Sequence, residues 1–133
     1  MDLTLRPVGR VESALRDRAG APMQADEGAP AAWLVFDPAY RRAMADLRVG
    51  DAIVLLTWLH EADRETLEVR PRDDPRRPLT GVFSTRSPDR PNPIGLHRVT
   101  VTEVDGDRVR VDHLEAIDGT PLVDVKVSRG DGA

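Results

Sequence analysis

The sequence predicts a mainly β fold, either a β-barrel or a strongly curved sheet, with one short helix. Stretches with strand character outnumber helical ones by roughly seven to one. Beyond Leu96 the apolar residues recur with the period of two that strands require, and Asp-Gly pairs at 105–106 and 118–119 predict tight turns between them. The chain has neither the alternation of strands and helices nor the G-x-G-x-x-G turn of a doubly wound nucleotide-binding domain.

In the first part of the chain we expect two strands separated by a loop: Leu3–Ser13, the loop Asp17–Pro30, and Ala31–Phe36. The loop is rich in glycine, proline, alanine and charged residues, which favour irregular structure. Asp37 and Pro38 then have the character of a helix N-cap and a first helical residue. We expect this helix to run to about Leu47 and to end at Gly50.

The rest of the chain is expected to consist of strands. Ala52–His60 is a nearly continuous apolar run, typical of a strand that is buried on both faces. Two weaker strands, Thr66–Arg70 and Gly81–Ser84, flank the proline- and arginine-rich connection Pro71–Pro78. The last three strands are marked by alternating valines: Val99, Val101 and Val104; Val109 and Val111; and Val123, Val125 and Val127.

Composition limits the class of protein. With 133 residues, we expect one domain over 1–133 with no additional C-terminal domain. The chain has no apolar run of membrane-spanning length, no signal-peptide pattern and no cysteine, as in a cytoplasmic protein without a disulfide framework or thiolate metal site. The net charge of −4 argues against a protein that binds RNA by positive charge alone. Lys126 is the only lysine, which reflects either the preference of arginine for phosphates and bases or a GC-rich genome.

The segment Thr85–Leu96 is unusual as structure. Its three prolines at 88, 91 and 93 fix the backbone and exclude a helix or an interior strand. A stiff segment of this kind presents Arg86, Arg90 and Asn92 in defined directions, where arginine suits a carboxylate or phosphate and asparagine suits an adenine edge. Gly95 permits the backbone to approach a ligand closely. The alternative is a rigid corner between two strands, with its arginines in solvent.

Two motifs of this sequence resemble the TrmO (YaeB-like, TsaA-like) family of S-adenosylmethionine-dependent methyltransferases, which methylate N6 of threonylcarbamoyladenosine at position 37 of tRNA. They are Thr85-Arg86-Ser87-Pro88-x-Arg90-Pro91-Asn92-Pro93-Ile94-Gly95-Leu96 and Asp118-Gly119-Thr120-Pro121-x-Val123-Asp124-Val125-Lys126. Weaker similarity extends through 7–13, 22–24 and the apolar run, so that the resemblance covers essentially the whole chain. It implies a single-sheeted β-barrel and a homodimer that holds S-adenosylmethionine near the subunit interface, with no metal.

Position by position, the resemblance also implies a set of site residues. Those on the cofactor side are Ala25, Asp26, Glu27, His60, Glu61, Arg86, Leu96, Asp112, His113, Leu114 and Glu115. Those on the substrate side are Arg90, Asn92, Thr120, Asp124 and Lys126. Three positions keep a simpler alternative: a hydrogen-bonded core histidine for His60, an ordinary hairpin turn for 118–120, and an exposed ion pair for Asp124 with Lys126.

Methyl transfer from a sulfonium is an in-line displacement, so catalysis depends mostly on positioning. The N6 of a carbamoylated adenine is a poor nucleophile, and we expect Asp118 to accept its proton. The chain departs from the family where Lys126 is followed by Val-Ser-Arg rather than Pro-Tyr, and few aromatic residues remain to stack on the bases of an anticodon loop. In a dimer, a basic groove would come from the arginines at 70, 72, 76 and 77. The alternatives are a small-molecule or peptide acceptor, or a non-catalytic S-adenosylmethionine-binding protein.

Overall fold

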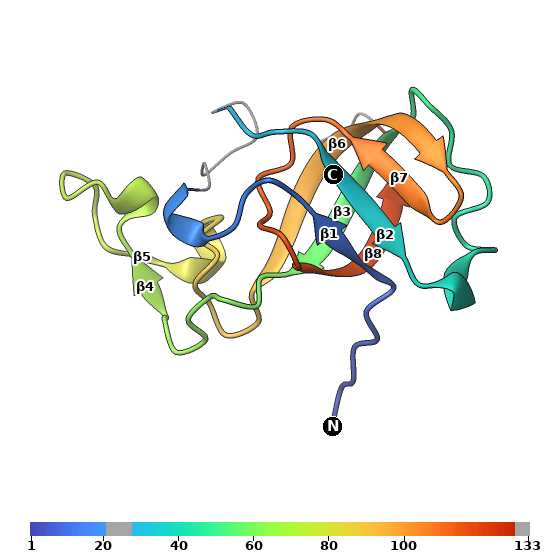
Figure 1. Ribbon diagram of the computed structural model, residues 1–133. Coiled ribbons are helices and arrows are strands. Elements are labelled where there is room, and N and C mark those ends of the chain that lie inside the picture. The colour runs from blue at the N-terminus through green and yellow to red at the C-terminus, as the bar shows by residue number, and fades with distance from the viewer. Residues whose placement is uncertain (21–27, 130–133) are drawn as a thin grey trace.

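The structure is a computed structural model that describes residues 1–20 and 28–129. Its body is a closed barrel of antiparallel strands in the order β1-β2-β7-β6-β3-β8 (Figure 1). The strands are β1 Gly9–Glu12, β2 Ala32–Phe36, β3 Ala52–Trp58, β6 Ile94–Asp105, β7 Arg108–Val111 and β8 Pro121–Val127. The mainly β fold expected from the sequence and the barrel implied by the resemblance are therefore confirmed.

A small extension leaves one end of the barrel, at the left of Figure 1. It contains a separate two-stranded sheet of β4 (Glu68–Val69) and β5 (Thr80–Gly81), with the 3-10 turn η4 (Pro71–Asp73) between them. A second 3-10 turn, η5 (Val82–Ser84), follows β5 directly. The strand expected over 66–70 is thus reduced to two residues, because the ladder is limited to Glu68 with Gly81 and Val69 with Thr80. The strand expected over 81–84 is wrong beyond Gly81, because residues 82–84 form η5.

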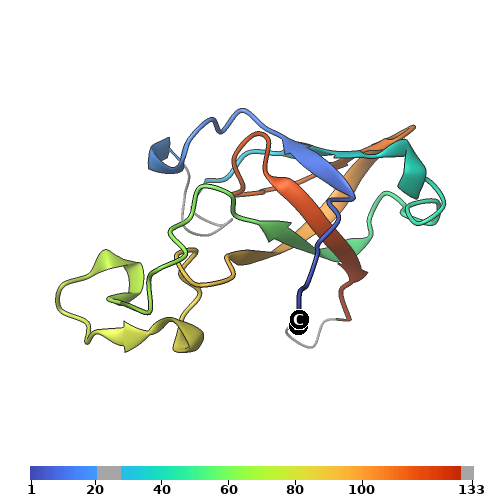
Figure 2. The same ribbon diagram turned by 90° about the horizontal axis from the view of Figure 1, so that it is seen from below.

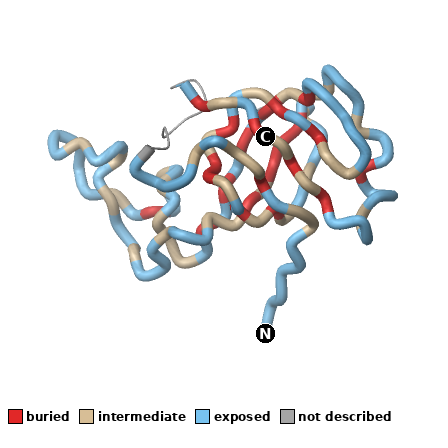
Figure 3. Tube along the Cα trace, in the orientation of Figure 1, coloured by how far each residue is buried: buried red, intermediate tan, exposed pale blue. Residues whose placement is uncertain are grey.

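Buried residues are concentrated on the strands of the barrel (Figure 3). Along β6, buried and exposed residues alternate from Ile94 to Val101, so that one face of the strand lines the interior. The most completely buried apolar side chains are Val11, Leu34, Leu55, Val109, Val111, Leu114 and Leu122. Burial of such side chains, at about 25 cal/mol per Å² of apolar area, is the main term that stabilises the barrel.

Strand β6 is long because it pairs with β3 along its first part and with β7 along its second part. Its first part pairs with β3 as far as Thr100, and its second part pairs with β7 from Val101 to Asp105. The register shifts between Val101 and Glu103, and a bulge of this kind bends a strand. β3 is buried at Ile53, Val54 and Leu55 in succession, which confirms the expected strand buried on both faces.

The helix expected from Asp37 to Leu47 is wrong. Only the 3-10 turn η3 (Pro38–Tyr40) forms, although Asp37 caps it as predicted and accepts a hydrogen bond from the Ala39 N–H at 2.9 Å. The following backbone bonds connect residues three apart, for example from Leu47 to Met44. Met44 is the only side chain buried in this connection, and a short helix with so small an apolar face lacks the packing that stabilises helices in proteins.

The first strand is also shorter than expected, because it begins at Gly9 rather than Leu3. Leu3 and Leu5 are 83% and 49% exposed and have no barrel strand to pack against. Residues 1–7 lie outside the barrel, as Figure 2 shows from below.

Because the strands are antiparallel, alternate connections meet at the same end of the barrel. One end, which we call the site end, receives the described residues of three connections: 13–20 with 28–31, 59–93, and 112–120. The 3-10 turn η1 (Arg18–Gly20) lies in the first of them. The opposite end carries the connections 37–51 and 106–107. In the described part of the chain, no helix has the length and apolar character needed to cross a membrane.

Candidate functional site

Most of the site residues implied by the resemblance lie at the site end. The connection 59–93 carries His60, Glu61, Arg86, Arg90 and Asn92, and the connection 112–120 carries Asp112, His113, Leu114, Glu115, Asp118 and Thr120. Leu96, Asp124 and Lys126 lie instead on β6 and β8, at positions exposed on the barrel wall. Ala25, Asp26 and Glu27 fall outside the described residues. Closure of the barrel thus brings together segments that are far apart in the sequence.

Arg90 locks the proline-rich segment onto itself. Its guanidinium donates to the carbonyl oxygens of Ser87 at 2.7 Å, Val82 at 2.7 Å and Thr85 at 2.6 Å. A planar guanidinium is suited to join several acceptors in fixed directions. Arg90 therefore has the structural role of a clamp in this conformation, and its expected contact with a substrate stays a prediction.

Asn92 and Arg86 differ in their surroundings. Arg64 donates to the Pro91 carbonyl at 2.8 Å and to Oδ1 of Asn92 at 3.2 Å, and its guanidinium lies 5.0 Å from the centre of the Trp58 ring. Asn92 is thus held from the side by a residue that the sequence did not single out. Arg86 is exposed, and its guanidinium has no partner among residues 1–20 and 28–129.

Arg18 joins the first connection to the proline-rich segment. Its guanidinium donates to the Glu61 carbonyl at 3.1 Å and forms an ion pair with Asp89 at 3.1 Å. Oδ1 of Asp89 also accepts a hydrogen bond from the Asp63 N–H at 2.9 Å. Burial opposes the ionisation of Asp89. The hydrogen bonds from the Asp63 N–H and from Arg18, together with the positive charge of Arg18, outweigh burial and lower the pKa of the Asp89 carboxyl below its ordinary value.

The lowered pKa of Asp89 predicts a pH-dependent contribution to stability. Its stabilising charge is fully present above the unfolded pKa of about 3.9 and is lost as the pH falls through the lower folded value. We expect Asp89→Asn to lower the urea midpoint at neutral pH, with the gap to wild type closing as the pH falls below the unfolded pKa and through the lower folded value. The asparagine retains an acceptor for the Asp63 N–H, so the gap reports on charge. A gap that stays constant down to low pH would contradict this account.

A buried hydrogen-bonded chain lies where the barrel meets the site end. Oγ1 of Thr57 is 2.7 Å from Nε2 of His97, and Nδ1 of His97 is 2.6 Å from Oε1 of Glu115. Thr57 is 0% and His97 5% exposed. The other oxygen of Glu115, Oε2, is buried and has no hydrogen-bond partner in the described structure. Of these three residues only Glu115 was expected at the site.

The segment 112–115 is fixed by backbone contacts on both sides. The Leu114 N–H donates to the Pro30 carbonyl at 2.9 Å, and Oδ1 of Asp112 accepts from the Thr100 N–H at 2.8 Å. His113 has a positive φ of 36°, and its Nδ1 lies 3.2 Å from the Ala29 carbonyl. Leu114 is fully buried, so that it anchors the segment and leaves its neighbours nearer the surface.

Asp118 and Thr120 shape the turn before β8. Oδ1 of Asp118 accepts from the Ser13 N–H at 3.0 Å, and Oδ2 accepts from the exposed Arg16 at 3.1 Å. Thr120 is buried and donates from Oγ1 to the Ile117 carbonyl at 2.7 Å, which leaves it no surface for a substrate in this conformation. Gly119 has the positive φ of 84° that an Asp-Gly turn requires. Asp124 and Lys126 form an exposed pair at 3.5 Å.

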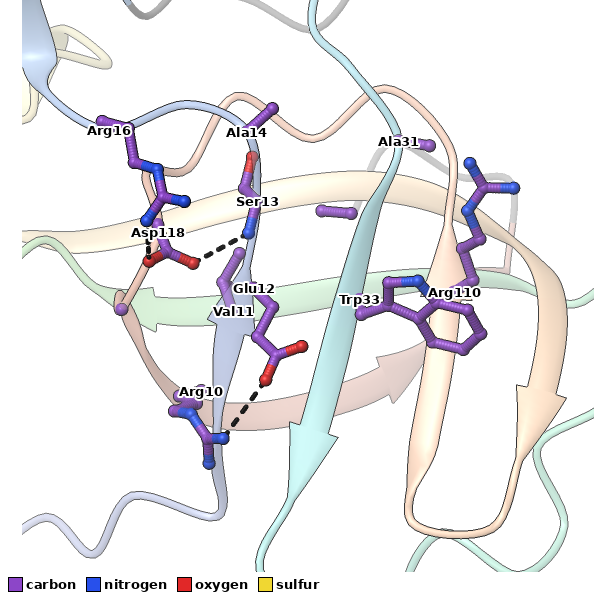
Figure 4. A pocket seen from close by; sticks show the side chains of 12 residues that line it. Arg10, Val11, Glu12, Ser13, Ala14, Arg16, Ala31, Trp33, Arg110 and Asp118 are labelled. Carbon is purple, nitrogen blue, oxygen red and sulfur yellow. Dashed lines mark hydrogen bonds and ion pairs between the residues drawn. The ribbon is translucent and has the colours of Figure 1, made fainter.

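A shallow polar hollow opens on the outer wall of β1, β2 and β7 beside Asp118 (Figure 4). Trp33 and Arg110 lie together on one side of it, and Arg16 with Asp118 lies on the other. Arg108 stacks its guanidinium 4.4 Å from the centre of the Trp33 ring. Within residues 1–20 and 28–129, no group of three or more His, Cys, Asp or Glu residues is placed to hold a metal ion.

Sequence reasoning missed Thr57, His97 and Arg18. Thr57 and His97 carry a usable signal: Thr57 interrupts a nearly continuous apolar run, and His97 lies at an interior position of a period-two pattern. Arg18 has no comparable signal, since one arginine in a polar loop looks like any other.

Comparison with known proteins places the chain among named relatives. It matches the family model described as the tRNA-methyltransferase O N-terminal domain over residues 10–128. It is 41% identical over 126 residues to a Methanothermobacter thermautotrophicus protein named probable S-adenosyl-L-methionine-binding protein, with 95% of this chain and 90% of the relative covered. An Archaeoglobus fulgidus protein named S-adenosyl-L-methionine-binding protein is 35% identical over 124 residues, with 93% and 88% covered.

Solved structures share the fold. The crystal structure of TrmO from Pseudomonas aeruginosa matches with a TM-score of 0.78 and 25% identity, covering 100% of this chain and 60% of that chain. Another crystal structure of TrmO matches with a TM-score of 0.77 and 27% identity, covering 100% of this chain and 59% of that chain. The chain therefore spans less than two thirds of the TrmO chains, whereas it spans most of the two relatives above.

Proposed function

The chain belongs to the family of tRNA-methyltransferase O N-terminal domains, and from this we propose that it is an S-adenosylmethionine-dependent methyltransferase acting on N6 of threonylcarbamoyladenosine at position 37 of tRNA. The observation that carries the proposal is the family match over residues 10–128. Two relatives that align with most of the chain, and are named for binding S-adenosylmethionine, support the cofactor. We place the enzyme in the cytoplasm, with the tRNA that it would modify.

The residues at the site end fit the chemistry of this methyl donor. The guanidinium of Arg86, which has no partner in the described part of the chain, suits the carboxylate. Oε2 of Glu115, which likewise has no partner there, suits the ammonium. When bound, S-adenosylmethionine supplies an electrophilic methyl group on its sulfonium. The chain would contribute position: the Arg90 clamp and the Arg18–Asp89 pair hold the proline-rich segment against the connection 59–67.

The hollow in Figure 4 supports a nucleic-acid acceptor. Its walls combine an aromatic ring, Trp33, with the guanidinium of Arg110, which is exposed and has no partner among the described residues. Single-stranded RNA is bound by stacking its bases on such rings and by phosphate contacts to arginine. Asp118 lines the same hollow, which would bring an RNA bound there close to the expected proton acceptor. In contrast, Arg76 in the extension is already paired with Asp74.

Replacing Arg110 with alanine is expected to weaken tRNA binding several-fold. If Arg110 contacts one phosphate, the slope of log affinity against log salt concentration should fall by about 0.7–0.9. Filter binding over a range of salt concentrations measures both quantities. Arg42→Ala is the matched control, because Arg42 is also exposed but lies in the connection 37–51 at the opposite end. Equal losses in the two variants would argue against RNA binding in this hollow.

Asp118 is the proposed proton acceptor. Asp118→Asn retains an oxygen for the Ser13 N–H but removes the charge, and we expect turnover to fall about 100-fold while cofactor affinity is unchanged. Because Arg16 already contacts Oδ2, Arg16→Ala serves as the companion variant and should leave turnover intact. Single-turnover methylation assays with calorimetry on each variant test this, and full turnover in Asp118→Asn would exclude the role.

A homodimer is part of the proposal. Several large apolar side chains are exposed on the extension and on the outer wall of β6: Leu67, Leu79, Phe83, Ile94 and Leu96. Large contiguous patches of exposed apolar side chains are typical of protein interfaces, and we propose that these residues form such a patch. A second subunit on this face would cover Leu96, which the resemblance places beside the cofactor.

The deciding experiment incubates the protein and S-adenosylmethionine with tRNA that carries unmethylated threonylcarbamoyladenosine. Light scattering beforehand should give twice the mass of the chain. Mass spectrometry of the digested tRNA should show the modified nucleoside heavier by one methylene. Transfer to an added small molecule or peptide instead would establish that acceptor, and cofactor binding with no transfer to any of them would leave a binding protein.

A further inference from the structure

The buried chain Thr57–His97–Glu115 links three separate parts of the fold. Thr57 lies on β3, His97 on β6, and Glu115 in the connection 112–120 at the site end. The two hydrogen bonds of 2.7 Å and 2.6 Å are short, and the ring of His97 is almost completely buried. Nothing in the proposed mechanism uses Thr57 or His97.

A hydroxyl, an imidazole and a carboxylate in this order have the arrangement of a hydrolase triad. Thr57, however, is 0% exposed, so its hydroxyl cannot reach a substrate. The accessible end of the chain is the other one, because 18% of the Glu115 side chain remains exposed. Any contact of these three residues with a ligand is therefore made by Glu115 and not by Thr57.

One protonation pattern satisfies the interior of the chain. A neutral His97 with its proton on Nδ1 donates to Oε1 of Glu115 and accepts the Thr57 hydroxyl proton at Nε2. The carboxylate of Glu115 thereby selects the tautomer, because it can only accept a hydrogen bond, whereas the hydroxyl of Thr57 can donate or accept. What remains is Oε2 of Glu115, a buried carboxylate oxygen without a donor. Such an atom is costly to bury unless a donor reaches it.

Gly95 connects this chain to the proline-rich motif. Gly95 faces Thr57 across the β3–β6 pairing, and a Cβ atom placed on it would lie 2.5 Å from Oγ1 of Thr57 and 2.7 Å from Nε2 of His97. Any side chain at this position would enter the hydrogen bond between them. The glycine at the end of the motif is thus required by the Thr57–His97 bond.

We propose that His97, oriented by Thr57, is a positioning residue that holds Glu115 with Oε2 ready to accept a hydrogen bond from a cationic N–H group of a ligand at the site end. The inference rests on the proposed function, in which that group is the ammonium of the methyl donor. His97 touches no ligand itself. Its effect passes through the carboxylate that it fixes.

The test compares two nucleosides by calorimetry. S-Adenosylhomocysteine carries the ammonium, and 5′-methylthioadenosine has the same nucleoside without the amino acid. His97→Leu should weaken binding of the first by roughly 10- to 100-fold, the range expected for a lost charged hydrogen bond, and leave the second unchanged. His97→Asn should restore much of the affinity, because its amide can donate to Glu115 from the position of Nδ1.

A second measurement needs no ligand. Nitrogen-15 NMR of the wild type should show His97 with its proton on Nδ1, and Glu115→Leu should abolish the preference for that tautomer, since leucine offers no acceptor at Nδ1.

Equal losses for both nucleosides in His97→Leu, with no rescue by asparagine, would reduce His97 to a structural role and overturn the proposal. Unchanged affinity for both nucleosides would overturn it as well, because binding of the ammonium would then not depend on the position of Glu115. Wild-type protein that binds neither nucleoside would instead overturn the proposed cofactor.

Discussion

Gly95→Ala is expected to destabilise the protein by about 2–5 kcal/mol, the sum of overpacking the interior and breaking a buried hydrogen bond. The added methyl group would collide with Oγ1 of Thr57, Nε2 of His97 and, at 3.1 Å, Cδ2 of Leu59. Neither Thr57 nor His97 can move away without breaking the hydrogen bond between them, because both side chains are buried in the barrel interior. Urea denaturation measures the loss, and calorimetry on the folded fraction should show weakened S-adenosylhomocysteine binding.

Gly81→Ala is the matched control for this variant. Gly81 lies in β5 with a negative φ, and a Cβ atom there meets no other atom within 4 Å. Its replacement should change stability by less than about 0.5 kcal/mol. Similar destabilisation of the two variants would mean that the cost arises from glycine replacement in general and not from the Thr57–His97 bond.

Leu55→Ala is expected to cost about 2–5 kcal/mol, because it removes a completely buried side chain and leaves a cavity. Leu55 points into the barrel at the centre of β3, where the strand is paired on both sides with His97 and Val125. The next residue, Leu56, has the same chemistry but is only partly buried, so Leu56→Ala should cost at most about 1 kcal/mol. Thermal or urea unfolding of the two variants side by side decides whether the barrel interior is the core.

The parts of the fold that sequence patterns predicted correctly are local in origin. β3 is recognisable because its apolar run needs no information from elsewhere, and the turns at Gly106 and Gly119 follow from positive φ angles that glycine accepts. The helix after Asp37 failed for a related reason. The N-cap was read correctly, but only tertiary packing decides whether a short helix continues, and here Met44 alone is buried.

The candidate site was predicted in its segments but not in its contacts. The motif indicated that 85–96 is rigid, and the clamp of Arg90 provides the physical reason. The contact between Thr57 and His97 depends on the register of β3 against β6, which sets Thr57 opposite Gly95. Register across a closed barrel is fixed by all its strands together and is not encoded in any one window of sequence. The same holds for Ser13 with Asp118, which are separated by most of the chain.

The seam between β1 and β8 is closed partly by strand pairing and partly by a turn. β1 pairs with β8 only through Gly9 and Arg10, whereas its pairing with β2 runs the full length of the strand. Beyond that short ladder, the Gly119 N–H donates to the Val11 carbonyl at 2.8 Å and the Ser13 N–H donates to Asp118 at 3.0 Å. Integrity of the ring at this point therefore depends on the conformation of the turn before β8, so that a change in this turn would open the β1–β8 side of the barrel before the β1–β2 side.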